Sequence, residues 1–347
     1  MGRVISISAR ALLWSTSCIL LLFYSALAHS SEHTTTCDFK KAVPGKTVAF
    51  EIEHDGEPRQ FHLHLPSNYD CTKNFALVIG VHGYGGSGPD FESNTAKMFE
   101  HVNDKNYIAL YPTAMAASPG GARSFNDLGS RHDNGPDGKT CSQSNPGYYP
   151  AFENCGVAEK IRECNWGTSC ADDVGFFRKM IAFAKLNYAV DSSRVFMLGF
   201  SQGGQTVASL ACPLQEELTA VAAIHGFAAN GYTCGPQSKV SLLQIWGTQD
   251  QWVRADGGAS LDTMQYDSAE EAAQEWAAAQ DCDPQASQYG SMSDDVDDWS
   301  CKTHANCKTG SEIITCSWPG AHTWPQTESL GNFGLNTIWD FFSNKRK

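Results

Sequence analysis

Apolar and polar residues alternate at residues 50–54 and again at residues 59–65, and Asp55-Gly56 lies between the two segments. Alternation with a period of two predicts half-buried strands, and an Asp-Gly pair favours a tight turn between them. Residues 75–81 are instead continuously apolar, as expected of a strand that is buried on both faces. This part of the chain is therefore predicted to form a β-hairpin followed by a central strand.

Apolar runs typical of strands recur along the rest of the chain and alternate with segments of helical periodicity. The predicted strands are residues 107–111, 194–198, 220–224, 242–246 and 312–316. The predicted helices are residues 174–187, 268–280 and 336–343, the first with Asp172 and Asp173 as candidate N-caps. Strands that alternate with helices predict an α/β fold, in which a mostly parallel central sheet is flanked by helices.

Two polar stretches interrupt this alternation. Residues 118–170 are rich in Gly, Pro, Asn and Asp and contain four cysteines, and residues 283–309 contain two more. We expect both to be disulfide-pinned loops over the sheet, with the first an insertion that overhangs a cleft. Because neither stretch has the composition of a linker, residues 29–347 are predicted to form a single domain.

The N-terminal residues 1–28 have the pattern of a secretory signal peptide. Arg3 and Arg10 precede an apolar stretch at residues 11–27, and Ala26-Leu27-Ala28 fits the small-x-small cleavage pattern. The alternative is a membrane anchor, but serines interrupt the stretch and no second long apolar run follows. We therefore expect cleavage after Ala28 and a secreted, extracellular protein that does not use a membrane as partner.

The cysteines agree with an oxidising compartment. Twelve follow the predicted signal peptide: Cys37, Cys71, Cys141, Cys155, Cys164, Cys170, Cys212, Cys234, Cys282, Cys301, Cys307 and Cys316. An even number behind a signal peptide predicts disulfides, although the pairing does not follow from the sequence. Zinc binding is the alternative, but the chain has no C-x-x-C pair.

The charge and composition limit the partners. The formal net charge is −13, and an acidic protein repels a phosphate backbone, so nucleic acid is not an expected partner. Residues 133–138 resemble a calcium loop superficially but lack its bidentate glutamate. We expect no metal and no cofactor.

The most informative motif is Gly199-Phe200-Ser201-Gln202-Gly203, which follows the predicted strand at 194–198 and precedes a helix-compatible run. A G-x-S-x-G sequence between a strand and a helix is typical of a nucleophile elbow, a strained turn that exposes the serine hydroxyl at the edge of a sheet. The alternative is an ordinary glycine-rich turn. The context predicts that Ser201 is a nucleophile.

A serine nucleophile needs a histidine base and a carboxylate that orients it, here expected in the chain order Ser, Asp, His. Asp250 follows the predicted strand at 242–246, and His322 follows the last one. The competing residues fit less well: Asp256 and Asp262 lie further from the strand end, His304 lies in a polar loop, and His225 comes too early in the chain. His225 is instead expected to be a packed or hydrogen-bonded histidine near the site.

Backbone N–H groups must stabilise the oxyanion of the tetrahedral intermediate. One donor is expected from Gln202, directly after the nucleophile. The second is expected from Tyr84 or Gly83, in the glycine-rich loop at residues 82–88.

Five motifs in this order, V-H-G-Y-G-G-S-G, D-D-V-G-F-F, G-F-S-Q-G-G, W-G-T-Q-D and G-A-H-T-W-P, resemble the α/β-hydrolase family of secreted polyhydroxybutyrate depolymerase-like esterases, which includes feruloyl and acetylxylan esterases. The resemblance covers residues 46–342. It implies the triad Ser201, Asp250 and His322 and a bridge between Cys212 and Cys234. Trp246 departs from the family, whose members commonly carry His there.

These features favour a secreted carboxylic-ester hydrolase that works through an acyl-enzyme. Feruloylated plant polysaccharide is the preferred substrate, with Trp252 and Trp324 as candidate substrate-stacking residues. Polyhydroxyalkanoate and acetylated xylan are the alternatives. A catalytically inactive binding protein is a remote alternative because Ser201, Asp250, His322 and the glycine loop are all present. A peptidase with the same triad is a further alternative, but no motif in the sequence supports it.

Overall fold

The computed structural model describes residues 40–116, 122–126, 171–227, 233–259, 261, 265–290 and 299–347. These residues belong to one compact unit, Cys37–Lys347. The predicted signal peptide and nearly all of the predicted insertion at 118–170 lie outside the described residues, so the domain start at residue 29 stays a prediction. Among the described helices, none combines the length and the hydropathy that a membrane span requires.

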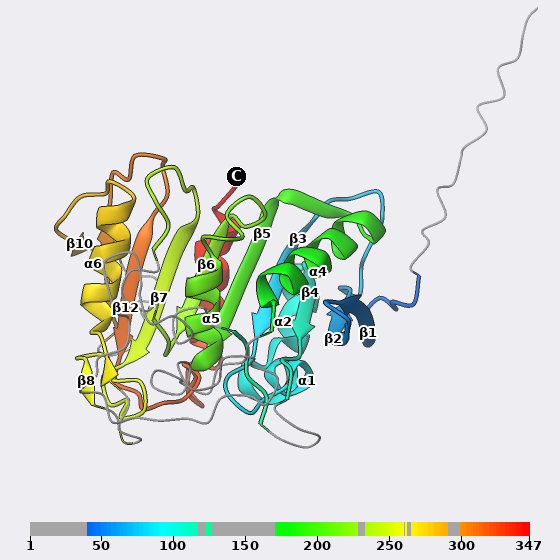
Figure 1. Cartoon of the computed structure of the whole chain (residues 1–347), viewed down its shortest axis with the longest axis horizontal. Helices are drawn as coiled ribbons and strands as arrows, with labels where there is room; N and C mark the ends of the chain where they lie inside the picture. The colour runs from blue at the N-terminus through cyan, green and yellow to red at the C-terminus, as the bar shows by residue number, and fades with distance from the viewer. Residues whose placement is uncertain are drawn as a thin grey trace, which may run out of the picture. The chain divides into compact units, whose positions relative to one another are not determined.

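The described strands form a sheet in the order β1-β2-β4-β3-β5-β6-β7-β12-β11-β10 (Figure 1). The strands are β1 (Thr47–His54), β2 (Glu57–His64), β3 (Phe75–Val81), β4 (Ile108–Pro112), β5 (Val190–Phe200), β6 (Ala220–Ile224), β7 (Ser241–Gly247), β10 (Ser287–Gln288), β11 (Ser300–His304) and β12 (Ile313–Trp318). From β4 to β12 all neighbouring strands are parallel, which confirms the predicted mostly parallel sheet. Two short strands, β8 (Gly258–Ala259) and β9 (Gln265–Tyr266), pair separately.

The predicted hairpin forms one edge of the sheet. Strands β1 and β2 pair antiparallel through Asp55 and Gly56, whose φ angles are 55° and 77°. Positive φ at both central residues is the requirement of a tight type I′ turn, and Asp-Gly meets it at little cost.

The core lies on both faces of the sheet. Alternate residues of β3 point to opposite sides, so that Leu77 and Ile79 belong to one buried cluster and Ala76 and Val78 to the other. Helices cover each face and bury these side chains. Figure 1 shows α4, α5 and α6 in front of the sheet and α7 behind it. Residues of α4, α5 and α6 belong to the cluster that contains Leu77, and residues of α7 belong to the cluster that contains Ala76. This is the predicted layer arrangement.

The described helices are α1 (Gly88–Asp90), the π-helical turn η1 (Phe91–Thr95), α2 (Met98–Lys105), α4 (Asp173–Asn187), α5 (Gln202–Leu210), α6 (Ala269–Ala279) and α7 (Phe333–Ser343). Several of them begin where a polar side chain caps the first turn. Asp172 caps α4, Ser268 forms a capping box with Glu271, and Asn332 caps α7. The Asn332 cap explains why α7 begins three residues before the predicted start.

One prediction is wrong. The polar stretch at 283–309, expected to be a loop, contains β10 and β11, which extend the sheet beyond β12. A disulfide between Cys301 and Cys316 joins β11 to β12, and a second joins Cys282 to Cys307. A third joins Cys212 to Cys234, the pair that the family resemblance implies.

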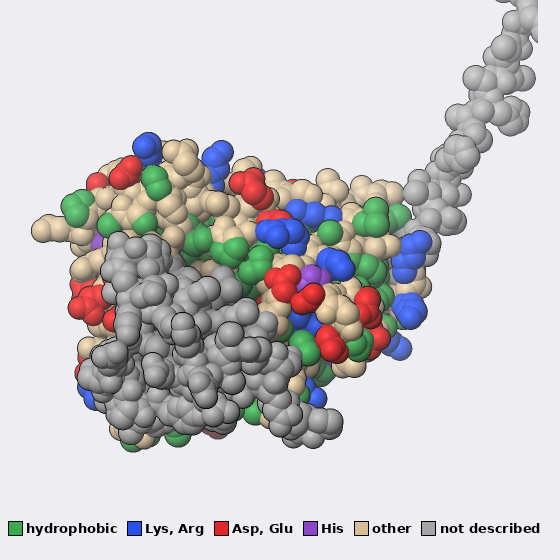
Figure 2. Space-filling view, viewed as in Figure 1, with side chains coloured by type: hydrophobic (Ala, Val, Ile, Leu, Met, Phe, Trp, Pro, Cys, Tyr) green, Lys and Arg blue, Asp and Glu red, His purple; other side chains and the backbone are tan. Residues whose placement is uncertain are grey.

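Charged side chains of both signs lie among apolar ones on the described part of the face in Figure 2. Exposed ion pairs include those of Lys73 with Asp70 and of Arg254 with Asp256. Exposed pairs contribute little to stability, so the packed core on both faces of the sheet is the main support of the site.

Candidate active site

Ser201 lies in a sharp turn between β5 and α5. Its φ and ψ angles are 58° and −125°, a strained combination for a residue with a side chain. The neighbouring glycines make this turn possible. A Cβ on Gly199 would collide with the Gly203 carbonyl, and a Cβ on Gly203 would collide with the carbonyls of Val81 and His82. The turn therefore has the geometry of the predicted elbow, held by backbone close contacts on both sides.

The structure brings Ser201, Asp250 and His322 together from three different strand ends. His322 Nε2 lies 2.9 Å from Ser201 Oγ, and His322 Nδ1 lies 2.7 Å from Asp250 Oδ2. A carboxylate only accepts hydrogen bonds, so Nδ1 of His322 carries a proton and its N–H donates a hydrogen bond to Asp250. Nε2 then has a free lone pair, which accepts a hydrogen bond from the Ser201 hydroxyl. This arrangement is competent to remove the serine proton.

Both carboxylate oxygens of Asp250 accept hydrogen bonds. Its Oδ1 accepts backbone N–H groups of Trp252 at 2.8 Å and Val253 at 3.0 Å, while Oδ2 accepts from the two imidazoles of His225 and His322. Burial alone raises the pKa of Asp250, but hydrogen bonds from His225 and His322 outweigh it and lower the pKa well below its usual range. The carboxylate therefore stays ionised and fixed in orientation.

His225 is a second histidine on Asp250. Its side chain is fully buried at the end of β6, and its Nδ1 lies 2.6 Å from Asp250 Oδ2. Burial lowers the pKa of His225, although the hydrogen bond to Asp250 raises it. A neutral imidazole whose Nδ1 carries the proton satisfies both observations. The sequence placed His225 near the site but did not identify Asp250 as its partner.

These groups are also the candidate metal ligands among the described residues. One ligand atom from each of His225, Asp250 and His322 lies within 4.8 Å of the others. However, both imidazoles direct an N–H toward the same carboxylate oxygen, whereas a metal requires a lone pair from each ligand. The hydrogen-bond pattern therefore fits a proton-transfer site better than an ion site.

The glycine-rich loop packs against the elbow. A Cβ on Gly83 would lie 3.0 Å from the Phe200 carbonyl oxygen and 3.2 Å from Ser201 Cβ, so only glycine brings the backbone this close to the serine. Tyr84 follows with a side chain that is 47% exposed. Gln202 is the first residue of α5, and its backbone N–H therefore has no partner within the helix. The predicted donors Gln202, Tyr84 and Gly83 thus lie around the elbow and the adjoining loop.

A short described segment, residues 122–126, supports the same loop. The Gln202 side chain donates to the Phe125 carbonyl at 2.8 Å, and Gly85 N–H donates to the Arg123 carbonyl at 2.8 Å. Asp173, which is buried and paired with Arg59, accepts the backbone N–H of Asn126 at 2.6 Å. The sequence did not indicate these contacts, because they join residues that are distant along the chain.

The two predicted substrate-contacting tryptophans differ. Trp252 is 49% exposed on the loop after Asp250. Trp324 is only 4% exposed, packs edge-on against Phe91, and donates its indole N–H to Asn332 at 2.7 Å. Its ring is part of the core, so we assign Trp324 to packing near the His322 loop rather than to substrate contact.

Comparisons with known proteins agree with this geometry. Residues 159–279 match a family model described as Phospholipase/Carboxylesterase. Feruloyl esterase B of Piromyces equi is 26% identical over 295 residues, which are 82% of this chain and 44% of that protein. A probable feruloyl esterase C of Aspergillus flavus is 27% identical over 208 residues, 60% of this chain and 61% of that protein. The chain thus spans less than two thirds of the length of these relatives.

A solved structure shares the fold. The acetyl xylan esterase from Aspergillus awamori aligns with a TM-score of 0.53 and 14% identity, covering 85% of this chain and 99% of that chain. At this identity the likeness concerns the fold alone. Together with the matched family model, the curated relatives and the elbow geometry, it leads to one conclusion: the chain has an α/β-hydrolase fold and is similar in sequence to carboxylic ester hydrolases that include the feruloyl esterases.

Proposed function

We propose that this protein is a secreted serine esterase that hydrolyses feruloyl esters of plant cell-wall polysaccharide through an acyl-enzyme. The observation that carries the proposal is the hydrogen-bonded series Ser201–His322–Asp250 at the strand ends. The names of the curated relatives, feruloyl esterases of Piromyces equi and Aspergillus flavus, support the choice of acyl group.

The geometry accounts for the first half of the reaction. Ser201 Oγ attacks the ester carbonyl carbon while its proton passes to His322 Nε2, 2.9 Å away. The carbonyl oxygen gains the negative charge and is stabilised by the N–H of Gln202 and a second N–H from Tyr84 or Gly83. The C–O bond to the alcohol then breaks. The alcohol leaves with the proton from His322, and the acyl group stays on Ser201.

The second half repeats these steps with water. His322 Nε2 accepts a proton from water, whose oxygen attacks the acyl carbon and displaces Ser201 Oγ. Asp250 stabilises the imidazolium that forms in both halves, and its ionised state follows from the lowered pKa described above. The free acid and the original Ser201 hydroxyl are regenerated.

Secretion is supported by the disulfides. The bridges Cys212–Cys234, Cys282–Cys307 and Cys301–Cys316 are of a kind that persists in oxidising compartments. Together with the predicted signal peptide they favour an extracellular enzyme, and the ester-bearing polysaccharide is then the expected partner.

The proposed function is tested by comparing turnover of methyl ferulate with turnover of a 3-hydroxybutyrate oligomer, using the oxidised protein and Ser201→Ala as control. Release of ferulate that vanishes in Ser201→Ala supports the proposal. Faster cleavage of the hydroxybutyrate oligomer would reassign the protein as a polyester depolymerase. Absence of turnover of either ester and of p-nitrophenyl acetate would refute the esterase function.

A further inference from the structure

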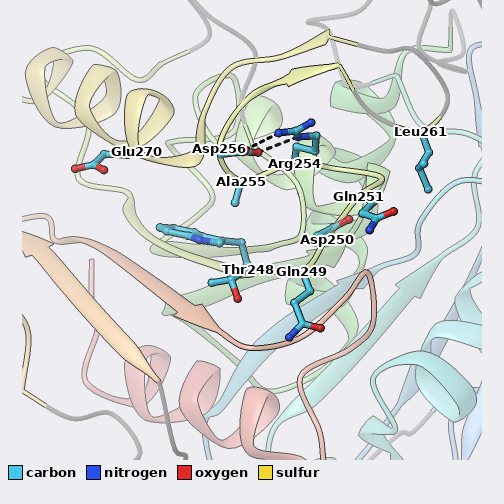
Figure 3. A pocket seen from close by; sticks show the side chains of 10 residues that line it. Thr248, Gln249, Asp250, Gln251, Arg254, Ala255, Asp256, Leu261 and Glu270 are labelled. Atoms are coloured by element: carbon cyan, nitrogen blue, oxygen red, sulfur yellow. Dashed lines mark hydrogen bonds and ion pairs between the residues drawn. The ribbon is translucent and has the colours of Figure 1, made fainter.

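A cavity of about 850 Å³ lies beside the catalytic aspartate. Figure 3 shows Glu270 at one end, Leu261 at the other, and the Arg254–Asp256 ion pair between them. The volume is within the range of roughly 300–1,000 Å³ that is usual for small-molecule sites. The residues that line it are Trp246, Thr248, Gln249, Asp250, Gln251, Arg254, Ala255, Asp256, Leu261 and Glu270.

The backbone connects this cavity to the reaction centre. The Asp250 side chain is completely buried against His225 and His322, so the Asp250 main chain is what borders the cavity. Thr248 N–H donates to the Trp318 carbonyl at 2.8 Å, and Gln249 N–H donates to the Gly320 carbonyl at 2.9 Å. Gly320 precedes His322 by two residues, and the cavity therefore adjoins the loop that carries the catalytic base.

The lining combines polar and apolar surface in about equal parts, which argues against a purely apolar ligand. Three of its ten residues are apolar (Trp246, Ala255 and Leu261), while the others offer a hydroxyl, two side-chain amides and charged groups. An acyl chain would leave these groups without hydrogen bonds, at a cost for each one. A ligand with many hydroxyl groups would satisfy them.

The charges argue against an anionic ligand. Arg254 is paired with Asp256 through Nε–Oδ1 at 2.9 Å and a second contact to Oδ2. Asp256 and Glu270 add carboxylates to the lining, and Lys302 Nζ lies 3.8 Å from Glu270 Oε1. Such a lining repels phosphate or a free carboxylate and accepts hydroxyl donors.

Trp246 supplies a flat apolar surface among these polar groups. Its indole is partly buried and lies edge-on to Phe227 at 6.3 Å between ring centroids, which limits its movement. A fixed aromatic face surrounded by amides and carboxylates suits a sugar ring, which has apolar C–H faces and polar hydroxyl edges.

We propose that this cavity binds the carbohydrate on the alcohol side of the ester bond, with a sugar ring on Trp246. The inference rests on the proposed function, because it assumes that the leaving alcohol is a sugar. Binding there positions the ester at Ser201 without taking part in the chemistry. Variants in the cavity therefore change recognition of sugar esters and leave esters of simple alcohols unaffected.

The kinetic test compares a feruloylated arabinoxylan oligosaccharide with methyl ferulate, in Trp246→Ala and Gln251→Ala. We expect KM for the oligosaccharide ester to rise about tenfold in Trp246→Ala with kcat unchanged, and both constants for methyl ferulate to stay at the wild-type values. Gln251→Ala should give a smaller rise, and Gln288→Ala, on the exposed strand β10, serves as its matched control. Equal effects on both substrates, or none on either, would refute the proposal.

A binding measurement separates this inference from the proposed function. An ester-free arabinoxylan oligosaccharide is titrated into Ser201→Ala by calorimetry, and into Ser201→Ala combined with Gln251→Ala or Glu270→Gln. Binding that weakens in the double variants supports the cavity as a sugar site even if methyl ferulate is not hydrolysed. Absence of binding, or binding that the cavity variants do not weaken, contradicts it. Gln251 and Glu270 are exposed, so these variants test the cavity even if Trp246→Ala does not fold.

Discussion

The proposed reaction centre and the neighbouring cavity are built in different ways, although Asp250 belongs to both. In the reaction centre, short hydrogen bonds join Ser201, His322, Asp250 and His225 at 2.6–2.9 Å, and three of these side chains are mostly or fully buried. In the cavity, the polar groups are longer side chains such as Arg254 and Asp256, which are 41% and 70% exposed.

This difference in rigidity fits the two proposed tasks, catalysis in the reaction centre and recognition of a sugar in the cavity. Proton transfer and attack on a carbonyl require atoms held in place before the substrate arrives, because small displacements reduce the rate steeply. Recognition of a sugar tolerates adjustable side chains, because many weak hydrogen bonds share the binding energy. Changes in the reaction centre should therefore reduce kcat for every ester, whereas changes in the cavity should alter KM for sugar esters alone.

The largest effect is expected from Ser201→Ala. Without the hydroxyl no acyl-enzyme forms, and kcat should fall by about 10⁶-fold for sugar and methyl esters alike. Initial rates on methyl ferulate and on the feruloylated oligosaccharide measure this. A loss confined to one of the two substrates would contradict a shared reaction centre.

Asp250→Asn should lower kcat by about 10⁴-fold, because an amide N–H in place of an accepting oxygen favours the wrong tautomer of His322. The Oδ2 atom of Asp250 accepts from His225 as well as His322, so the substitution disturbs two donors at once. Steady-state kinetics on methyl ferulate, with circular dichroism as a check of folding, provides the measurement. Retention of more than a tenth of the activity would show that Asp250 does not orient the base.

His82, at the start of the glycine loop, predicts a pH dependence of stability. Its Nδ1 donates to the Gly83 carbonyl at 2.7 Å and its Nε2 accepts from Ala114 N–H at 3.0 Å. Burial lowers the pKa of His82 to about 4, although the hydrogen bond to the Gly83 carbonyl raises this pKa in part. Between about pH 6.5 and pH 4 the unfolded chain binds a proton that the folded chain does not.

The free energy of unfolding should consequently fall as the pH drops through this window, with a His82 contribution on the order of 3 kcal/mol. Urea unfolding at several pH values, for the wild type and His82→Gln, measures it. The variant should show a shallower decline between pH 6.5 and pH 4. Parallel curves would mean that His82 titrates equally in both states.

The smallest effect is expected from His225. His225→Ala removes one of two imidazole donors to Asp250 and should lower kcat on all esters by about tenfold. Loss of this donor also raises the pKa of Asp250, so inactivation by protonation of this carboxylate should begin at a higher pH in the variant. His225→Gln retains an amide donor and should restore much of kcat and of the low pKa of Asp250. If glutamine gives no recovery, His225 acts through packing alone.

The sequence could predict that Ser201, Asp250 and His322 meet, because parallel strands bring their carboxyl ends to one edge of the sheet. Ser201, Asp250 and His322 each follow a strand with a clear apolar pattern, and β5, β7 and β12 lie in the parallel part of the sheet. His225 also follows such a strand, β6, between β5 and β7. Its partner depends on the register of β6 and β7, in which Ile224 lies opposite Ile245, and the hydrophobic pattern alone does not determine that register.

The errors have physical causes as well. Strand β11 consists of Ser-Cys-Lys-Thr-His, and a strand with this few apolar residues has no alternating pattern to detect. The segment α1–η1–α2 was not predicted because Gly88 and Pro89 indicate a turn and Lys97 takes a left-handed φ of 52° before α2. Trp324 is near His322 in sequence, but its indole points into the core against Phe91, and proximity along the chain does not determine side-chain direction.

The central claim is that Ser201 is the nucleophile of an ester hydrolase. The most direct test is to label the oxidised protein with a fluorophosphonate and locate the adduct by peptide mass spectrometry. We expect one adduct, on Ser201, which His322→Ala slows strongly and Ser201→Ala abolishes. An adduct on another residue, or no adduct on folded protein, would contradict it.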